Sequence, residues 1–125
     1  MAKVLLVEDD ESLRLLYSKN LKAKNFEVET AVDGKDAFSK LKLFKPDLII
    51  LDIILPGING IEILQILKGD AEFEKIPVIM LTSISEVNRI KECLDSGAKG
   101  YIMKDKRVSA EEIAEKVNLL LGLSG

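Results

Sequence analysis

The 125-residue chain contains no histidine and only one cysteine, Cys93. Without histidine it cannot form a Ser-His-Asp triad, use an imidazole as general acid or base, or build the common histidine-containing zinc sites. A lone cysteine excludes an intramolecular disulfide and is typical of a reducing compartment, so we expect a cytoplasmic protein. We interpret Cys93 as a small apolar helix residue, because a nucleophilic thiol would want a histidine base beside it.

Long hydrophobic runs and an excess of basic charge are also missing. The apolar run at residues 4–7 is too short for a signal peptide or a membrane span, and no other run approaches such a length. With 18 basic and 21 acidic residues, the net charge of −3 argues against a general nucleic-acid or membrane surface. We therefore expect one soluble domain over residues 1–125 that binds neither nucleic acid nor membrane directly.

Short apolar runs alternate with segments of helical spacing along the whole chain. We predict strands at 3–8, 26–30, 47–52, 77–82 and 100–104, and helices at 11–24, 34–44, 60–68, 85–95 and from 109 onward. The first, third and fourth runs are apolar throughout, which indicates strands covered on both faces. Five such units are too few for an eight-stranded barrel. The predicted fold is therefore α/β, an open doubly wound five-stranded parallel sheet with helices on both faces.

Capping residues mark several predicted helix ends. Asp10 can cap the first helix and Asp33 the second, and Ser109 with Glu112 three residues later forms a capping box for the last.

For the fourth helix, Ser85 is the N-cap candidate and Gly97 lies just past the end. Its apolar stripe is predicted to contain Val87, Ile90 and Leu94.

Acidic, hydroxyl and ammonium groups follow four of the predicted strands. The first strand runs into Glu8 and Asp9, and the third ends in Asp52. The fourth ends in Thr82 and the fifth in Lys104. Each residue alone is commonplace at a loop or cap. Because parallel strands end at one edge, where ligands bind at the point of strand-order reversal, their joint placement indicates a site.

The chemistry of this set indicates phosphoryl transfer. Clustered carboxylates need a cation or a proton, and oxygen-only ligands favour Mg²⁺ or Ca²⁺. The chain has no calcium-binding loop, whereas Mg²⁺ needs few carboxylates and normally shares a phosphate. Lys104 and Thr82 suit phosphoryl oxygens, and no Walker or Gly-rich nucleotide motif is present. A carboxylate can itself be the nucleophile, and Asp52 is the best candidate because it faces the acidic pair from a central strand.

Four segments, in this order and spacing, resemble the receiver domains of two-component response regulators, such as the single-domain chemotaxis regulator. They are LVEDD at 6–10, DIILPGING at 52–60 with its D-x-x-x-P-x-x-x-G spacing, VIMLTS at 78–83 and GAKGYIMK at 97–104. The resemblance extends from residue 4 to about residue 121. It implies a flavodoxin-like sheet in the order 2-1-3-4-5.

The resemblance also implies roles for the acidic residues. Asp52 would accept a phosphoryl group from the phosphohistidine of a sensor histidine kinase or a histidine phosphotransfer protein. The reaction would depend on Mg²⁺ at a site formed with Asp52, in which Asp9 is a direct ligand, Glu8 holds the ion through water and Ile54 contributes its backbone carbonyl. Such a domain is not an enzyme, since it catalyses only its own phosphorylation and dephosphorylation.

Further residues would convert phosphorylation into an output. Thr82 and Lys104 would bind phosphoryl oxygens, and Tyr101 would turn inward and change the surface for an unknown output protein or domain. A phosphorylation-dependent dimer is one open form of that output. The chain departs from the family at Asp105, where a cis proline usually follows the lysine. Because a non-proline cis peptide costs about 2.5–4 kcal/mol, we expect a trans bond there.

Two other functions fit the sequence less well. An aspartate-nucleophile phosphatase of the haloacid dehalogenase type has D-x-D-x-[TV], whereas the residue two positions after Asp52 is Ile54. A flavodoxin-type binding module would need Ser, Thr or Gly in its first strand–helix turn, which here is acidic. The sequence leaves open the cognate kinase, and whether the domain stands alone or belongs to a longer DNA-binding regulator.

Overall fold

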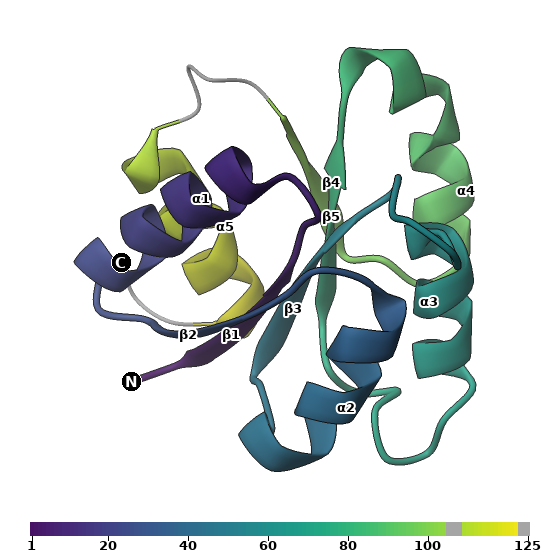
Figure 1. Cartoon of the computed structure of the whole chain (residues 1–125), viewed down its shortest axis with the longest axis horizontal. Coiled ribbons are helices and arrows are strands. Elements are labelled where there is room, and N and C mark those ends of the chain that lie inside the picture. The colour runs from purple at the N-terminus through teal and green to yellow at the C-terminus, as the bar shows by residue number, and fades with distance from the viewer. Residues whose placement is uncertain (105–108, 123–125) are drawn as a thin grey trace.

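The computed structural model describes residues 1–104 and 109–122. Its centre is a parallel sheet of five strands in the order β2-β1-β3-β4-β5, which confirms the predicted topology (Figure 1). The strands are β1 (Lys3–Val7), β2 (Glu27–Ala31), β3 (Leu48–Asp52), β4 (Val78–Thr82) and β5 (Gly100–Met103). Every strand agrees with the sequence prediction to within one residue at each end.

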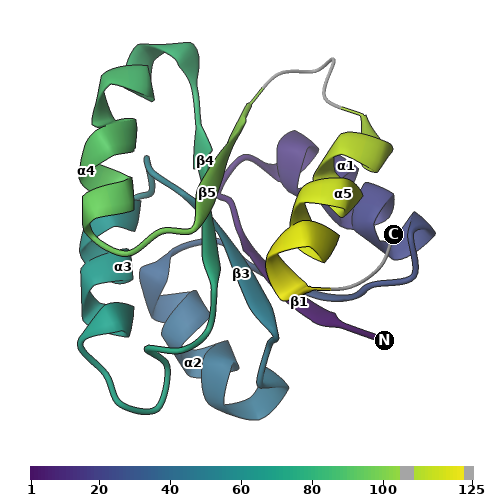
Figure 2. The ribbon, with the colours of Figure 1, turned by 180° about the vertical axis from the view of Figure 1, so that it is seen from behind.

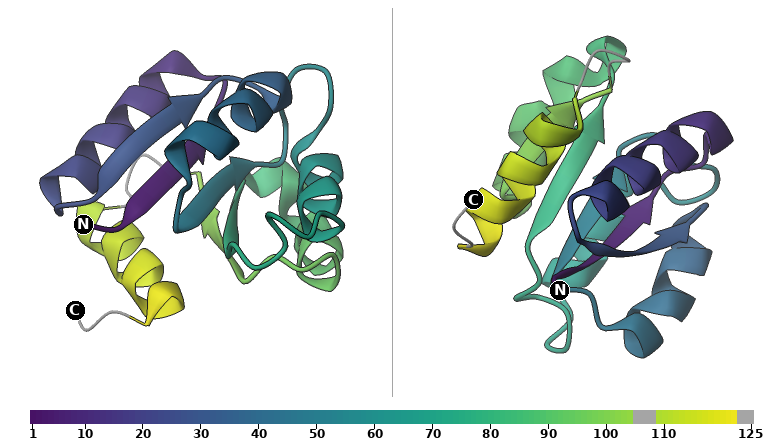
Figure 3. Two further views of the ribbon diagram at one scale, coloured as in Figure 1. Left: turned by 90° about the horizontal axis from the view of Figure 1, so that it is seen from below. Right: turned by 90° about the vertical axis from the view of Figure 1, so that its left-hand side faces the viewer.

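Helices cover both faces of the sheet. One layer contains α1 (Glu11–Ala23) and α5 (Ala110–Leu121), and the other contains α2 (Gly34–Phe44), α3 (Gly60–Lys68) and α4 (Ile90–Asp95). The two layers lie on opposite sides of the sheet in the front view (Figure 1) and in the view from behind (Figure 2), and Figure 3 shows the same molecule from below and from its left-hand side. Within residues 1–104 and 109–122, no helix combines the length and hydropathy that a membrane span requires.

The central strands are apolar throughout because they contribute to two cores. Alternate residues of a strand point to opposite faces of the sheet. In β3, Ile49 and Leu51 pack in the core beneath α2, α3 and α4, whereas Leu48 and Ile50 pack in the core beneath α1 and α5. A strand buried on both faces therefore needs no polar alternation, as the sequence indicated.

The predicted caps of three helices are confirmed. In each, a side-chain oxygen accepts a hydrogen bond from the backbone N–H three residues later, which satisfies a donor that the helix leaves unpaired. The pairs are Asp10 Oδ1 with Leu13 N (3.0 Å), Asp33 Oδ1 with Asp36 N (2.8 Å) and Ser109 Oγ with Glu112 N (3.1 Å).

The predicted helix at 85–95 is wrong in its form and its start. A 3₁₀ helix, η1 (Ile84–Arg89), comes first, and only Ile90–Asp95 is α-helical. Ser85 is not the cap, because η1 is preceded by Ser83, whose side chain makes no capping hydrogen bond. The Ser85 hydroxyl instead lies 2.8 Å from that of Ser83. Gly97 does follow the end of α4, with a φ of 108°.

The buried face of this segment also differs from the prediction. Cys93 is 1% exposed, whereas Leu94 and Val87 are 44% and 48% exposed. A 3₁₀ helix has three residues per turn, so a stripe drawn at 3.6 residues per turn loses register across η1. Cys93 is thus a core residue, and burial raises the pKa of its thiol. The predicted trans bond at Lys104–Asp105 lies outside the described residues.

Candidate functional site

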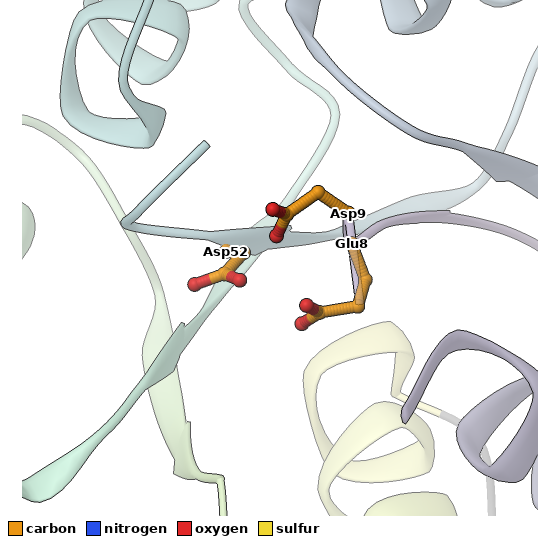
Figure 4. A group of neighbouring side chains, drawn as sticks. All are labelled: Glu8, Asp9 and Asp52. Carbon is orange, nitrogen blue, oxygen red and sulfur yellow. The ribbon is translucent and has the colours of Figure 1, made fainter. Parts of the chain in front are cut away.

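The acidic residues meet at the point where the order of the sheet reverses. β1 pairs with β3 in a register that sets Val7 opposite Leu51, so the chain leaves both strands at the same level. Glu8 and Asp9 follow β1, and Asp52 is the last residue of β3. Carboxylate oxygens from these three residues all lie within 4.8 Å of one another (Figure 4). The predicted clustering is therefore present in the structure.

Glu8 is the most perturbed member of the cluster. It has no exposed surface, and its pKa is raised to about 7. Burial is the largest cause, followed by the negative charge of Asp52, while the hydrogen bond from Asp10 N and the charge of Lys104 act in the opposite direction. A carboxyl group in this setting gains from any additional positive charge placed beside it.

Lys104 supplies an ammonium group between two of the carboxylates. Its Nζ lies 2.6 Å from Asp52 Oδ2 and 3.1 Å from Glu8 Oε2. Burial opposes its charge, but the hydrogen bond and charge of Asp52, and then those of Glu8, outweigh burial and raise the pKa of Lys104. The backbone N–H of Lys104 donates to the carbonyl of Thr82 at 2.7 Å, which ties the end of β5 to the end of β4.

Asp52 is buried, and both its carboxylate and its backbone carbonyl are in close contact with the segment that follows β3. Its Oδ1 accepts a hydrogen bond from Ile54 N at 3.2 Å. Gly60 N donates to the carbonyl of Ile53 at 2.8 Å, which brings the start of α3 against the end of β3. A Cβ on Gly60 would lie 1.9 Å from the backbone oxygen of Asp52. The glycine of the D-x-x-x-P-x-x-x-G spacing is thus required for this close approach.

The residues expected to respond to phosphorylation lie in two different environments. Thr82, at the end of β4, is fully buried, and its Oγ1 donates to the carbonyl of Ser83 at 3.2 Å. Tyr101, on β5, is 39% exposed. The ammonium of Lys116 lies 5.2 Å from the centre of the Tyr101 ring and also donates to the Tyr101 carbonyl at 2.8 Å. The structure therefore places this ring partly at the surface, in contact with Lys116.

The donor set fits a hard cation. The acids supply only oxygen atoms, which Mg²⁺ and Ca²⁺ prefer. Among residues 1–104 and 109–122, three carboxylates face the ammonium group of Lys104, so negative charge exceeds positive charge in this cluster. The Oε2 atom of Glu8 is buried and takes part in the ion pair with Lys104, yet it accepts no hydrogen bond of good geometry from the described residues. A bound cation would offset the excess negative charge and would give Glu8 Oε2 a further partner.

The contacts that Arg14 makes with the site were not predicted from the sequence. Arg14, in the second turn of α1, donates from Nη1 to the backbone carbonyls of Glu8 and Asp9. The available signal was a basic residue shortly after an acidic turn, at a position that can reach back over the helix start.

Comparisons with known proteins agree with this geometry. The chain matches the sequence model of the response regulator receiver domain over residues 4–118. It is 39% identical over 121 residues to the phosphate regulon transcriptional regulatory protein PhoB of Rhizobium meliloti (strain 1021), covering 97% of this chain and 52% of that protein. It is 36% identical to the DNA-binding dual master transcriptional regulator RpaA of Synechocystis sp. (strain ATCC 27184 / PCC 6803 / Kazusa), covering 97% and 49%. The chain spans about half the length of these relatives.

Solved structures share the whole fold. A putative response regulator from Chloroflexus aurantiacus J-10-fl is 25% identical with a TM-score of 0.89, covering 97% of this chain and 98% of that one. The chemotaxis protein CheY4 of Vibrio cholerae is 31% identical with a TM-score of 0.85, covering 95% and 98%. The region that matches the sequence model, residues 4–118, includes the acidic cluster and Lys104. The sequence match, the shared fold and the position of the acidic residues together show that the chain belongs to the response regulator receiver domains, the signalling switches of two-component systems.

Proposed function

We propose that this domain accepts a phosphoryl group from a phosphohistidine onto Asp52, in a Mg²⁺-dependent reaction, and then changes its surface for an output partner. One observation carries the proposal. Three carboxylates and the ammonium of Lys104 converge at the carboxyl edge of the sheet, with Nζ 2.6 Å from Asp52 Oδ2.

The proposed transfer needs little covalent chemistry from the protein. A carboxylate oxygen of Asp52 attacks phosphorus, a P–O bond forms, and the P–N bond to the donor imidazole breaks. The imidazole keeps the electron pair of that bond and takes up a proton from solvent. Positioning and neutralisation of charge supply most of the rate in such transfers. Lys104 already pairs with Asp52, so it is placed to contact an oxygen of a phosphoryl group added there.

The acidic residues would hold the metal ion. Asp9 and Asp52 would be direct ligands, Glu8 would act through water, and Ile54 would contribute its backbone carbonyl. Bound Mg²⁺ would supply positive charge that offsets both the carboxylates and the incoming phosphoryl oxygens.

The proposed switch connects the phosphoryl group to the surface. Thr82 would exchange its hydrogen bond to the Ser83 carbonyl for one to a phosphoryl oxygen. The space left by the hydroxyl would let the Tyr101 ring turn inward, which alters the surface formed by α4 and β5. This is a shift between two populations of the domain.

The partners follow from the same proposal. The donor would be a sensor histidine kinase or a histidine phosphotransfer protein. Two relatives of about twice this length are a transcriptional regulatory protein and a DNA-binding transcriptional regulator. We infer that the output comes from another domain, another protein or a phosphorylation-dependent dimer. With a net charge of −3, this domain itself is not suited to bind nucleic acid.

Intact-mass spectrometry after incubation with acetyl phosphate tests the central step. In Mg²⁺ the wild-type mass should rise by one phosphoryl group, in EDTA it should not, and Asp52→Asn should abolish the rise. Asp95→Asn, which changes an exposed carboxylate at the end of α4, is the matched control and should label as wild type does. Equal labelling of Asp52→Asn would refute the proposal. Sustained turnover of small phosphate esters would instead support the phosphatase alternative.

A further inference from the structure

Arg14 binds the backbone of the acidic turn between β1 and α1. Its Nη1 donates to the carbonyl oxygens of Glu8 at 3.0 Å and of Asp9 at 3.3 Å. These are two of the three residues whose carboxylates form the cluster at the sheet edge. One guanidinium nitrogen therefore fixes the relative orientation of two successive peptide groups that carry candidate ligands.

Within the part of the chain that the structure describes, the other contacts of this turn do not replace Arg14. Glu8 N donates to the Ala31 carbonyl at 3.0 Å, and Asp10 N donates to Glu8 Oε1 at 3.0 Å. Both place Glu8, but neither uses the carbonyl groups on either side of Asp9. Asp9 is exposed, so packing does little to fix its side chain. Its direction depends on the backbone that Arg14 holds.

Arg14 also differs from Lys104 in the atoms that it occupies. Lys104 pairs directly with the carboxylates of Asp52 and Glu8, so an incoming cation must share those oxygens with it. The contacts of Arg14 in this turn are to carbonyl oxygens, and they leave the carboxylates free. Arg14 thus brings positive charge to a run of three acids without competing for the ligand atoms.

We propose that Arg14 is a positioning residue of the metal site, an inference that rests on the proposed Mg²⁺-dependent function. It holds the β1–α1 turn so that the carboxylates of Glu8 and Asp9 face Asp52 before the ion arrives. Groups that orient metal ligands typically change metal affinity by about 10–100-fold when removed. Loss of Arg14 should therefore weaken Mg²⁺ binding by at least about tenfold.

Calorimetric titration with MgCl₂ tests this on the whole chain without any phosphoryl donor. Arg14→Met removes the charge and both hydrogen bonds while keeping a long side chain. Arg14→Lys keeps the charge and a donor, and should recover part of the lost affinity. Lys19→Met is the matched control, because it removes an exposed cation from the same helix about 7.5 Å further along its axis. Its Mg²⁺ dissociation constant should stay within about twofold of wild type, because an exposed charge that makes no contact with the turn is screened by water and salt.

Melting curves in EDTA separate positioning from general support of the fold. If Arg14→Met lowers the melting temperature but binds Mg²⁺ as tightly as wild type, Arg14 is only structural and the inference is overturned. If Arg14→Met does not fold, Arg14→Gln is titrated instead, and we expect the same loss of Mg²⁺ affinity. If the wild type itself binds no Mg²⁺, the metal site of the proposed function is wrong, and the role inferred for Arg14 is wrong as well. Weak binding by Arg14→Met, partial recovery by Arg14→Lys and an unchanged Lys19→Met support it.

Discussion

At the scale of single residues, Asp52 is held differently on its two oxygens. Oδ1 accepts from the backbone of Ile54, and Oδ2 accepts from the ammonium of Lys104. The chain thus fixes the carboxylate from the loop that follows β3 and from the end of β5. The residues that border this carboxylate should decide both how it reacts and how long a phosphoryl group stays on it.

The lifetime of the phosphorylated state should be long. The family resemblance places Ile54 and Ile84 beside the path of an attacking water, and they are 51% and 83% exposed. Neither side chain can orient water by a hydrogen bond. An orienting or basic group typically contributes about 10²–10⁴-fold, so we expect slow hydrolysis in wild type and decay faster by at least about tenfold in Ile54→Asn, Ile84→Glu. Decay of labelled protein in Mg²⁺ measures this, and a wild-type half-life of seconds would contradict it.

Gly60 should tolerate no side chain. Its missing Cβ leaves room for the Asp52 carbonyl, which would otherwise be 1.9 Å away. We expect Gly60→Ala to lower the free energy of unfolding by about 1–3 kcal/mol, as overpacking does, and to slow labelling of Asp52. Gly69→Ala is the control, because its Cβ would find its first neighbour at an ordinary 3.5 Å. Urea denaturation measures the free energy of unfolding of both variants. Equal values would show that the backbone at the end of β3 shifts easily to make room for a Cβ at position 60.

At the scale of elements, the strands could be predicted from the sequence, whereas the helical form of the segment that contains η1 and α4 could not. Each strand has a long apolar run or a clear turn at its ends, so local pattern and tertiary burial agree. In the 84–95 segment the same apolar spacing fits two helical forms, and a 3₁₀ start turns Leu94 outward and Cys93 inward. Packing against the sheet decides between the 3₁₀ and the α-helical form, and the sequence of the segment alone does not contain that information.

Tyr101 and Lys116 connect β5 to α5 at the surface that should change on phosphorylation. Lys116 holds the exposed ring by a cation–π contact, worth about 0.5–1 kcal/mol at such sites. We expect Lys116→Met to raise the inward population of Tyr101 by about two- to fivefold. Fluorine NMR of 3-fluorotyrosine-labelled protein gives two signals, with buried Tyr17 as the internal reference. If beryllofluoride leaves the Tyr101 signal unmoved, the proposed switch is wrong.

At the scale of the whole molecule, the site is assembled from segments far apart in the sequence. Lys104 and Glu8 are 96 positions apart, yet their side chains are in contact. The parallel topology predicted that such groups share an edge, and the structure confirms it for the three acids and Lys104. The pairing of Lys104 with Glu8 as well as Asp52, and the reach of Arg14 to two carbonyls, depend on side-chain directions that a strand pattern does not contain.

This assembly should make stability depend on Mg²⁺. Among the described residues, one oxygen from each of three carboxylates lies within 4.8 Å of the others, and Lys104 pairs with two of these groups, so the cluster carries uncompensated negative charge without a metal. Asp52→Asn leaves Glu8 paired with Lys104 and removes a repelling charge, so its melting temperature in EDTA should exceed that of wild type. Lys104→Met removes the compensating charge and should shift the melting temperature in the opposite direction.

Added Mg²⁺ should stabilise the wild type, because the ion binds the folded cluster and not the unfolded chain. At ten times the dissociation constant, linkage gives about 1.4 kcal/mol, or about 4–8 °C for a domain of this size. Asp52→Asn lacks one ligand and should show a smaller rise. Thermal scans by circular dichroism in EDTA and in MgCl₂, with NaCl at matched ionic strength as the screening control, measure both effects. Identical curves for Asp52→Asn and wild type in EDTA would mean that the repulsion among these acids costs the fold nothing.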